Sequence, residues 1–231
     1  MNVQEATTRR LPDLKERHLP ENCRETINTI LKETYGYEQF RNLEIYDDLS
    51  KGKEKLCISQ GQLIENVILE AEKAWKGETQ VDNILLTAPT GSGKSLLFQL
   101  PAIYLGKEYN LLTIVVSPLK ALIVDQVESL QELGYARVAY ASSDLSPEQK
   151  MEVYRQVREG EIDLFYLSPE LLLSYDIKHF VGERRIGLVV VDEAHTVTTW
   201  GKEFRVDYWF LGRYLTALKQ TLGYNFPLFA L

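Results

Sequence analysis

The sequence predicts an α/β fold: a mostly parallel sheet flanked by helices, with a helical N-terminal extension. Short apolar runs recur along the chain and alternate with stretches of helical periodicity, which is the pattern of parallel strands covered on both faces. With 231 residues, of which 45% are hydrophobic, the chain can bury a substantial core. A glycine-rich turn and an acidic string each follow an apolar run, where parallel sheets place their ligand sites.

The composition excludes several other classes of protein. The net charge of −7, from 26 basic and 33 acidic residues, argues against a polybasic nucleic-acid binder. No apolar run approaches the ~20 residues of a membrane span, and the N-terminus lacks the apolar core of a secretory signal. Cys23 and Cys57 form no CxxC pair, so we expect no zinc site or disulfide framework. An intracellular location follows, cytoplasmic or, in a eukaryote, nuclear.

The N-terminal part divides into an extension and the start of the main lobe. Residues 1–34 are polar and charged and are expected to form a helical extension, whereas residues 35–231 form the α/β lobe. One helix is expected to begin at 20–22, because three apolar residues after it fall on one face at helical spacing. The charged stretch 47–55 is interpreted as a surface loop or insertion, and a second helix is expected over 60–75.

From residue 84 onward, expected strands and helices alternate. The strands are expected at 84–88, 112–116, 137–140, 163–167, 187–191 and 227–231. The helices between them are expected at 95–105, at 119–133 and after 146–148.

The glycine-rich turn is typical of a phosphate-binding loop. Residues 88–95 read APTGSGKS between a strand and a helix, the context that such a loop requires. Backbone N–H groups at a helix N-terminus can surround phosphate oxygens. Lys94 can reach the β and γ phosphates of ATP, and the Ser95 hydroxyl can bind Mg²⁺. The candidate nucleotide-binding residues are Thr90, Gly91, Ser92, Gly93, Lys94 and Ser95. The alternative is an ordinary glycine-rich turn; Ala88 stands where the general pattern has glycine.

The acidic string supplies the candidate catalytic carboxylates. Asp192 and Glu193 end an apolar strand and precede Ala194 and His195. Asp192 can hold Mg²⁺, and Glu193 can orient and deprotonate an attacking water. His195 could sense the γ phosphate. An ordinary helix start, where acids are common, is the alternative for the two acids, and a structural role is the alternative for His195.

These motifs together resemble those of superfamily 2 helicases, and further strings resemble the RecQ family. The strings are SPLKALIVDQV at 117–127, LSPEL at 167–171, WGKEFR at 200–205 and GYEQFR at 36–41. The resemblance covers residues 35–231 and implies the first RecA-like motor lobe of an ATP-dependent DNA helicase. Such an enzyme couples ATP hydrolysis to 3′–5′ translocation on single-stranded DNA and to duplex unwinding. We expect the chain to be truncated before motif III, with the second RecA-like lobe absent and the fragment alone poorly active.

The resemblance also implies a contact to the adenine base, where the sequence departs from the family pattern. Tyr37 and Arg41 match the motif as stacking candidates. The family glutamine that follows is replaced by Glu44, which can accept a hydrogen bond but cannot donate one. Gln62 is the preferred amide candidate, with Gln60 as another. A solvent-exposed helix start is the alternative for both glutamines.

Nucleic-acid contacts are expected from the strand ends and from the aromatic string. Aromatic rings offer faces for base stacking, and basic groups meet phosphates. The candidates are Ser117, Lys120, Ser168, Trp200, Lys202, Phe204 and Arg205. Core packing is the alternative for the aromatic residues and is the interpretation we adopt for Trp209 and Phe210. Lys202 and Thr196 replace the usual His and Cys of the family.

Three functional hypotheses stay open at this point. The first is the helicase lobe, with single-stranded or partially duplex DNA, the second lobe and a larger DNA-processing complex as partners, and no membrane; an RNA helicase is its near alternative. The second is a small-molecule P-loop kinase, for which no lid or acceptor site can be seen. The third is a nucleotide-switched binding module in a larger assembly, for example in genome defence.

Overall fold

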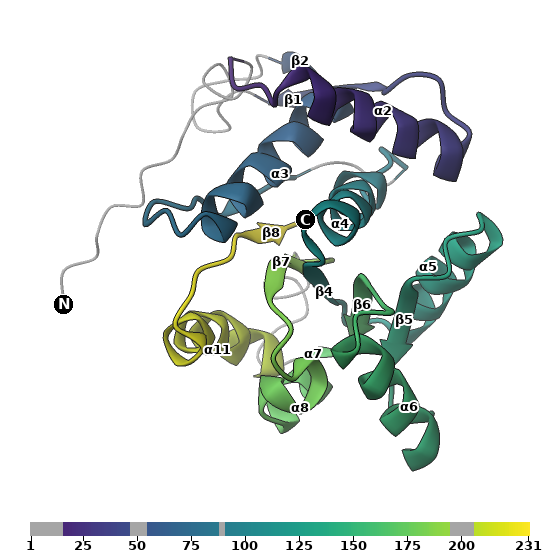
Figure 1. Ribbon diagram of the computed structural model, residues 1–231, viewed down its shortest axis with the longest axis vertical. Helices are drawn as coiled ribbons and strands as arrows, with labels where there is room; N and C mark the ends of the chain where they lie inside the picture. The colour runs from purple at the N-terminus through teal and green to yellow at the C-terminus, as the bar shows by residue number, and fades with distance from the viewer. Residues whose placement is uncertain (1–15, 47–54, 88–90, 195–205) are drawn as a thin grey trace.

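The computed structural model describes residues 16–46, 55–87, 91–194 and 206–231. It confirms the α/β fold (Figure 1). The helices are α2 Glu21–Tyr35, α3 Gln60–Trp75, α4 Leu96–Tyr109, α5 Lys120–Glu132, α6 Pro147–Arg158, α7 Pro169–Ser174, α8 Ile177–Val181 and α11 Val206–Leu222. The strands are β1 Asn42–Tyr46, β2 Lys55–Ser59, β3 Ile84–Leu85, β4 Leu112–Val116, β5 Val138–Ala141, β6 Leu164–Leu167, β7 Ile186–Val191 and β8 Leu228–Ala230.

Six strands form one parallel sheet in the order β3-β8-β7-β4-β6-β5. The described residues of β4 and β6 are all buried, as expected for central parallel strands made of continuous apolar runs. Strand β8 lies between β3 and β7, although it is the last of these strands in the chain. The two segments that precede the predicted ligand-binding motifs are therefore separated by one strand.

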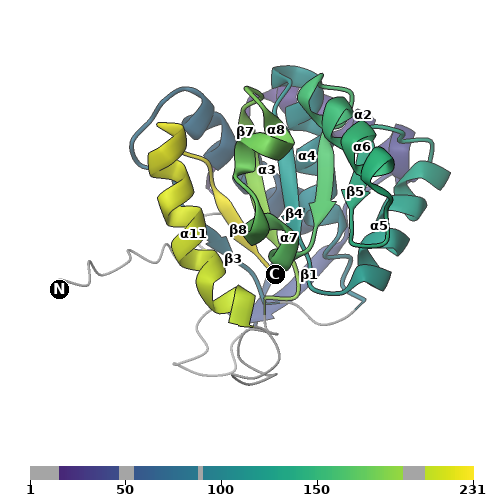
Figure 2. The same ribbon diagram turned by 90° about the horizontal axis from the view of Figure 1, so that it is seen from below.

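Two hydrophobic cores lie on opposite faces of the sheet because side chains alternate along each strand. One core contains Leu164 and Tyr166 of β6 together with residues of α2, α3, α4 and α5. The other contains Phe165 and Leu167 of the same strand together with residues of α6, α7, α8 and α11. Figure 2 shows the helices on both sides of the strands. Helix α2 of the N-terminal extension thus shares a core with the sheet.

An antiparallel hairpin, β1–β2, precedes α3 and was not predicted from the sequence. It pairs Asn42 with Ser59 and Tyr46 with Lys55. The predicted loop or insertion at 47–55 therefore ends in a strand, since β2 begins at Lys55, and the rest of that stretch lies outside the described residues. Arg41 precedes the hairpin and Gln60 follows it, and both residues are candidates for the nucleotide-binding site.

A buried carboxylate attaches the segment before α2 to α3. Glu70, with 1% of its side chain exposed, lies 2.5 Å from the Arg17 Nη2 and 3.0 Å from the Lys73 Nζ, and it accepts a hydrogen bond from the Asp82 backbone N–H at 2.8 Å. Burial raises the pKa of Glu70, but these hydrogen bonds and charges outweigh burial, and the pKa lies below its ordinary value.

The structure corrects the expectation for Phe210, whose side chain is 49% exposed instead of buried in the core. Phe210 lies on α11, a helix that is not predicted from the sequence. Its side chain is not part of the buried face of that helix, which is formed by Leu211, Leu215 and Leu218. The side chain of Trp209 lies outside those described. Within the described ranges, no helix has both the length and the apolar composition that crossing a membrane takes.

Candidate nucleotide-binding site

The phosphate-binding loop connects β3 to α4, as predicted. Gly91 and Gly93 have φ of 82° and 76°, a conformation that glycine adopts without strain. A Cβ at position 93 would lie 2.7 Å from the Gln60 Nε2, so a larger residue would have to displace the Gln60 amide in addition to adopting a positive φ. Thr90 lies outside the described residues. Ser95 precedes the first residue of α4, at the helix end that carries the positive pole of the helix dipole.

The loop also presents polar atoms suited to a phosphate and a cation. Among the described residues, the buried Ser92 Oγ has no hydrogen-bond partner, which fits a loop that completes its hydrogen bonds with a ligand. Ser95 and Asp192 supply a hydroxyl and a carboxylate, the oxygen ligands that Mg²⁺ prefers. Lys94 lies close enough to Asp192 for its charge to act on that carboxylate. The donor set therefore fits a nucleotide phosphate with Mg²⁺.

The candidate carboxylates follow β7. The Asp192 backbone N–H donates to the Val116 oxygen at 2.9 Å. The Asp192 Oδ1 accepts from the Glu193 N–H at 3.0 Å, and its Oδ2 lies 3.5 Å from the Ser117 Oγ. Burial and the charge of Glu193 raise the pKa of Asp192 above its ordinary value, and Lys94 opposes that rise. A bound cation would relieve this electrostatic cost.

Glu193 has an unusual backbone conformation. Its φ of 53° lies in the left-handed region, which costs a non-glycine residue of order 1–3 kcal/mol and is typical of functional sites. The Ala194 N–H donates to the Leu231 oxygen at 2.7 Å, and the Leu231 N–H donates to the Val191 oxygen at 3.0 Å. These bonds with the end of β8 hold the turn that contains Glu193. His195 lies outside the described residues.

Of the candidate adenine-binding amides, Gln60 is the one that contacts the phosphate-binding loop. Its side chain is 2% exposed. The Nε2 donates to the Ser92 oxygen at 3.1 Å, and the Oε1 accepts from the Arg41 N–H at 3.2 Å. The Gln60 N–H also donates to the Arg41 oxygen at 2.9 Å. Gln60 therefore joins the loop to Arg41, and the two ends of the β1–β2 hairpin meet at this pair.

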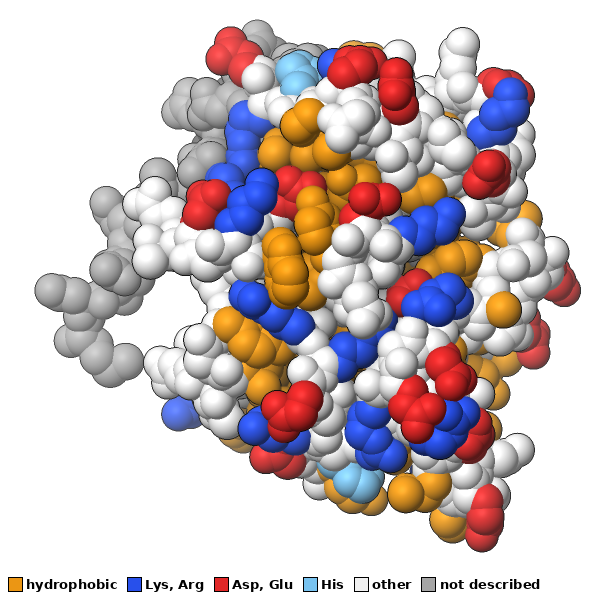
Figure 3. Space-filling view, viewed as in Figure 1, with side chains coloured by type: hydrophobic (Ala, Val, Ile, Leu, Met, Phe, Trp, Pro, Cys, Tyr) orange, Lys and Arg blue, Asp and Glu red, His pale blue; other side chains and the backbone are white. Residues whose placement is uncertain are grey.

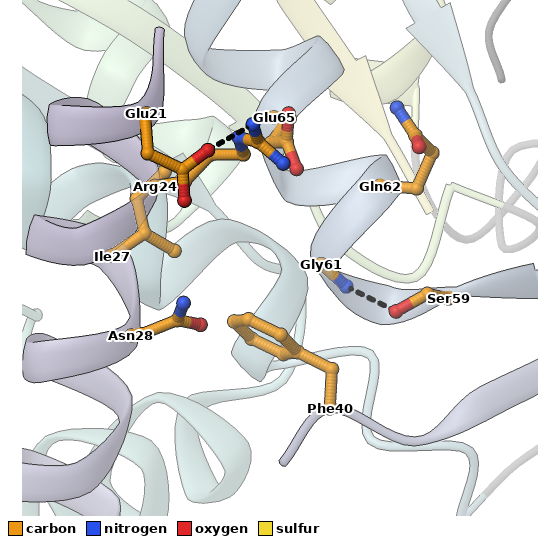
Figure 4. A pocket seen from close by; sticks show the side chains of 9 residues that line it. All are labelled: Glu21, Arg24, Ile27, Asn28, Phe40, Ser59, Gly61, Gln62 and Glu65. Carbon is orange, nitrogen blue, oxygen red and sulfur yellow. Dashed lines mark hydrogen bonds and ion pairs between the residues drawn. The ribbon is translucent and has the colours of Figure 1, made fainter. Parts of the chain in front are cut away.

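Gln62, the amide preferred on sequence spacing, lies elsewhere. Its Nε2 donates to the Arg17 backbone oxygen at 2.8 Å, and it lines a cavity of about 220 Å³ between α2 and α3 (Figure 4). The residues that line this cavity are Glu21, Arg24, Ile27, Asn28, Phe40, Ser59, Gly61, Gln62 and Glu65. Glu44 lies on β1, and its side chain is exposed. Which side chain contacts the base stays a prediction.

The stacking candidates form an aromatic and cationic group at the end of α2. The Tyr37 ring, 47% exposed, lies with its centroid 6.4 Å from that of Tyr35, and the two planes are within 17° of each other. The Arg41 guanidinium lies 5.9 Å from the Tyr37 ring centroid, a cation–π distance. Tyr37 and Arg41 therefore lie together, on the chain segment that Gln60 ties to the phosphate-binding loop.

The candidate nucleic-acid residues have different environments. Ser117 is 1% exposed and faces Asp192, so the structure places it in the carboxylate site and not on the surface. The Lys120 Nζ pairs with the Asp144 Oδ1 at 2.9 Å, and both side chains are exposed. The Ser168 Oγ accepts from the Leu171 N–H at the start of α7. The remaining candidates lie outside the described residues; they are Trp200, Lys202, Phe204 and Arg205.

Surface charge does not single out a binding face in the view of Figure 3. Basic and acidic side chains are interspersed across that face, with apolar side chains between them. This distribution agrees with the moderate net charge of −7. Binding of a polyanion on that face would depend on a few placed groups and not on a basic surface.

Comparison with known proteins supports the resemblance drawn from the motifs. The sequence profile described as "DEAD/DEAH box helicase" matches residues 63–223. The chain is 34% identical over 202 residues to "ATP-dependent DNA helicase RecQ" of Synechocystis sp., covering 87% of this chain and 35% of that protein. It is 38% identical over 143 residues to "Probable ATP-dependent DNA helicase RecS" of Bacillus subtilis, covering 62% of this chain and 27% of that protein.

Solved structures show the same fold. The structure of "DUF1998 helicase MrfA bound to DNA and AMPPNP" superposes with a TM-score of 0.57 at 21% identity, covering 93% of this chain and 26% of that one. The chain thus spans about a third or less of the length of these proteins.

Proposed function

The chain belongs to the DEAD/DEAH box helicase family and is RecQ-like within it, and from this we propose that it is the N-terminal ATP-binding motor lobe of an ATP-dependent DNA helicase. The single observation that carries the proposal is the arrangement around β8. The phosphate-binding loop follows β3, and the carboxylates follow β7, on the two sides of that strand. This arrangement supports a site in which one ligand contacts both motifs.

The proposed roles of the residues follow from their chemistry. Lys94 and the backbone N–H groups of the loop neutralise and orient the phosphates of ATP. Ser95 and Asp192 would hold Mg²⁺, which, when bound, offsets charge on the phosphate oxygens. Glu193 orients the attacking water and accepts its proton. Gln60 takes the place of Gln62 as the proposed amide near the base, with Tyr37 and Arg41 as stacking partners.

The coupling to nucleic acid is the finer part of the proposal. Lys120 and Ser168 follow β4 and β6 on the same edge of the sheet as the ATP site, and they contact the DNA backbone. Trp200, Lys202, Phe204 and Arg205 contribute stacking and charge, and His195 reports the γ phosphate. Together with a second lobe, the whole motor moves 3′ to 5′ on single-stranded DNA and unwinds duplexes. It works inside the cell, where ATP and DNA are present.

The test is the ATPase rate of the longest natural form of the protein, with and without single-stranded DNA. We expect DNA to stimulate hydrolysis, and Lys94→Ala and Glu193→Gln to abolish the stimulated rate. RNA of the same sequence, added as a competitor, separates DNA from RNA specificity. A wild-type rate that DNA does not change, or a Lys94→Ala variant that hydrolyses ATP normally, would overturn the proposal.

A further inference from the structure

A series of side-chain hydrogen bonds links the proposed magnesium ligand Ser95 to the core. The Gln126 Nε2 donates to the Ser95 Oγ at 3.0 Å. The Gln126 Oε1 accepts from the Gln99 Nε2 at 2.7 Å, and the Gln99 Oε1 accepts from the Tyr35 hydroxyl at 3.2 Å. The Gln99 Nε2 also donates to the Tyr166 hydroxyl at 3.2 Å. These five side chains come from α2, α4, α5 and β6 and from the residue that precedes α4.

The two ends of the Gln126 amide face different partners in this series. Gln99 is 5% exposed, and both ends of its amide are occupied. In this structure the Gln99 Nε2 donates to the Gln126 Oε1, a pairing of an N–H donor with an amide oxygen. The Gln126 nitrogen is thereby turned toward the Ser95 hydroxyl. A glutamine held in this way presents a donor at a defined position.

The consequence lies in the chemistry of a hydroxyl group. A serine hydroxyl has one proton and two lone pairs. The Gln126 N–H occupies one lone pair of Ser95, so the other lone pair and the proton are directed to the remaining sides of the oxygen. We propose that Gln126 is a positioning residue that fixes the Ser95 hydroxyl for the Mg²⁺ of a bound nucleotide, an inference that rests on the proposed nucleotide site.

The position of Gln126 on α5 supports this role over a role in packing. The buried residues of the helix are Ile123, Val127 and Leu130, whereas Gln126 is only partly buried and makes hydrogen bonds to Gln99 and Ser95. Helix α5 begins at Lys120, a proposed nucleic-acid contact. A residue of α5 therefore holds Ser95, and the first residue of the same helix is the proposed DNA contact. A movement of α5 would shift Gln126 and with it the hydroxyl of Ser95, the proposed magnesium ligand.

The experiment measures how much Mg²⁺ tightens nucleotide binding. The dissociation constant of a fluorescent ATP analogue is determined for the chain in Mg²⁺ and in EDTA, and the ratio of the two constants is the readout. We expect Gln126→Met, which keeps the length of the side chain but cannot donate, to reduce that ratio about fivefold to tenfold. Binding in EDTA should stay within about twofold of the wild type.

Two further variants make the test specific. Gln126→Asn keeps the amide but is one methylene shorter, and we expect a similar reduction of the ratio. Gln131→Met places the same substitution on the same helix, where the glutamine Nε2 lies 3.5 Å from the Val138 oxygen of β5 and not at Ser95, and we expect the wild-type ratio. Circular dichroism at 222 nm checks that each variant is folded.

The outcomes distinguish this inference from the proposed function. A wild-type ratio in Gln126→Met, or equal weakening of binding in Mg²⁺ and in EDTA, overturns the inference, because a general structural role predicts equal weakening. If either of these results is found but Lys94→Ala still weakens nucleotide binding, the proposed nucleotide site stands and only the inference about Gln126 fails. If the wild-type chain binds no nucleotide, or binds one without any effect of Mg²⁺, both the site and the inference fail.

Discussion

Replacing Asp163 by alanine is expected to cost the lobe much of its stability. Asp163, directly before β6, has no exposed surface on its side chain. Its Oδ2 lies 2.6 Å from the Arg137 Nε and accepts from the Tyr135 hydroxyl at 2.8 Å, and its Oδ1 lies 3.0 Å from the Arg184 Nη2. Arg184 has only 4% of its side chain exposed. The substitution therefore leaves a buried guanidinium without its counter-charge.

The magnitude follows from the burial and the distances. Opposite charges about 4 Å apart interact by about 4 kcal/mol at an effective dielectric constant of about 20. Breaking a buried pair by removing one partner typically costs about 3–5 kcal/mol. For a domain of this size, each kcal/mol lowers the melting temperature by about 2–4 °C, so a loss of about 3–5 kcal/mol predicts a decrease of about 6–20 °C.

The assay is thermal and urea denaturation followed by circular dichroism, with Asp144→Ala as the matched control. Asp144 also pairs with a cation, Lys120, at 2.9 Å, but the two side chains are 74% and 50% exposed. Exposed pairs contribute little to stability because water and salt screen them, so the control is expected to melt with the wild type. If the two variants lose the same stability, burial does not determine the contribution of these pairs, and the reasoning is refuted.

Three further predictions concern the phosphate-binding loop, the nucleic-acid surface and the dependence of stability on pH. Gly93→Ala should weaken binding of the fluorescent ATP analogue at least about tenfold, because position 93 has a φ of 76° and the added Cβ would lie 2.7 Å from the Gln60 Nε2. Unchanged affinity would contradict the geometry. Asp144→Ala should free Lys120 and tighten binding of single-stranded DNA severalfold at low salt but not at high salt, as measured by fluorescence anisotropy, and weaker binding at low salt would count against that role. Because the pKa of Glu70 is lowered on folding, its ionised form contributes stability above the ordinary carboxylate pKa, and this contribution is lost as the pH falls through the lower folded value. Urea denaturation of Glu70→Gln should therefore show a deficit at neutral pH that shrinks below about pH 4, and a deficit independent of pH would exclude this explanation.

The central sheet could be predicted because its signal is local and redundant. The strands β4 and β7 are runs of five and six residues, almost all of them apolar, and each is followed by a recognisable turn or motif. The helix at 60–75 was predicted with the bounds that the structure shows. Runs of this kind specify buried parallel strands without knowledge of their neighbours.

The hairpin and α11 were missed because their signals are weak. β1 and β2 read NLEIY and KLCIS, and the charged stretch between them contains no two-residue turn of the Asn-Gly type that marks a hairpin. Core packing is the sequence-based expectation for Trp209 and Phe210, whereas Phe210 is half exposed. Hydrophobicity alone does not tell which face of a helix an aromatic residue occupies.

The choice between Gln60 and Gln62 depends on geometry that spacing does not contain. Both follow the helix start at Ser59, and successive residues on a helix are rotated by about 100°. Two residues apart, the glutamines point to nearly opposite sides, one toward the Ser92 oxygen and the other toward the Arg17 oxygen. Only the packing of α3 against the loop decides between them.

The place of β8 in the sheet also has a consequence for how the lobe is made. The Leu228 N–H donates to the Asn83 Oδ1 at 3.0 Å across 145 residues of chain, and β3 pairs with β8 alone among the described strands. During synthesis on a ribosome, β3, the strand before the phosphate-binding loop, can therefore join the sheet only after β8 has been made. In a nascent chain that ends before residue 228, β8 is missing, so nothing pairs with both β3 and β7 to bring the two motifs that follow them together. Binding of a nucleotide to both motifs would therefore add to stability only after β8 has been inserted between β3 and β7.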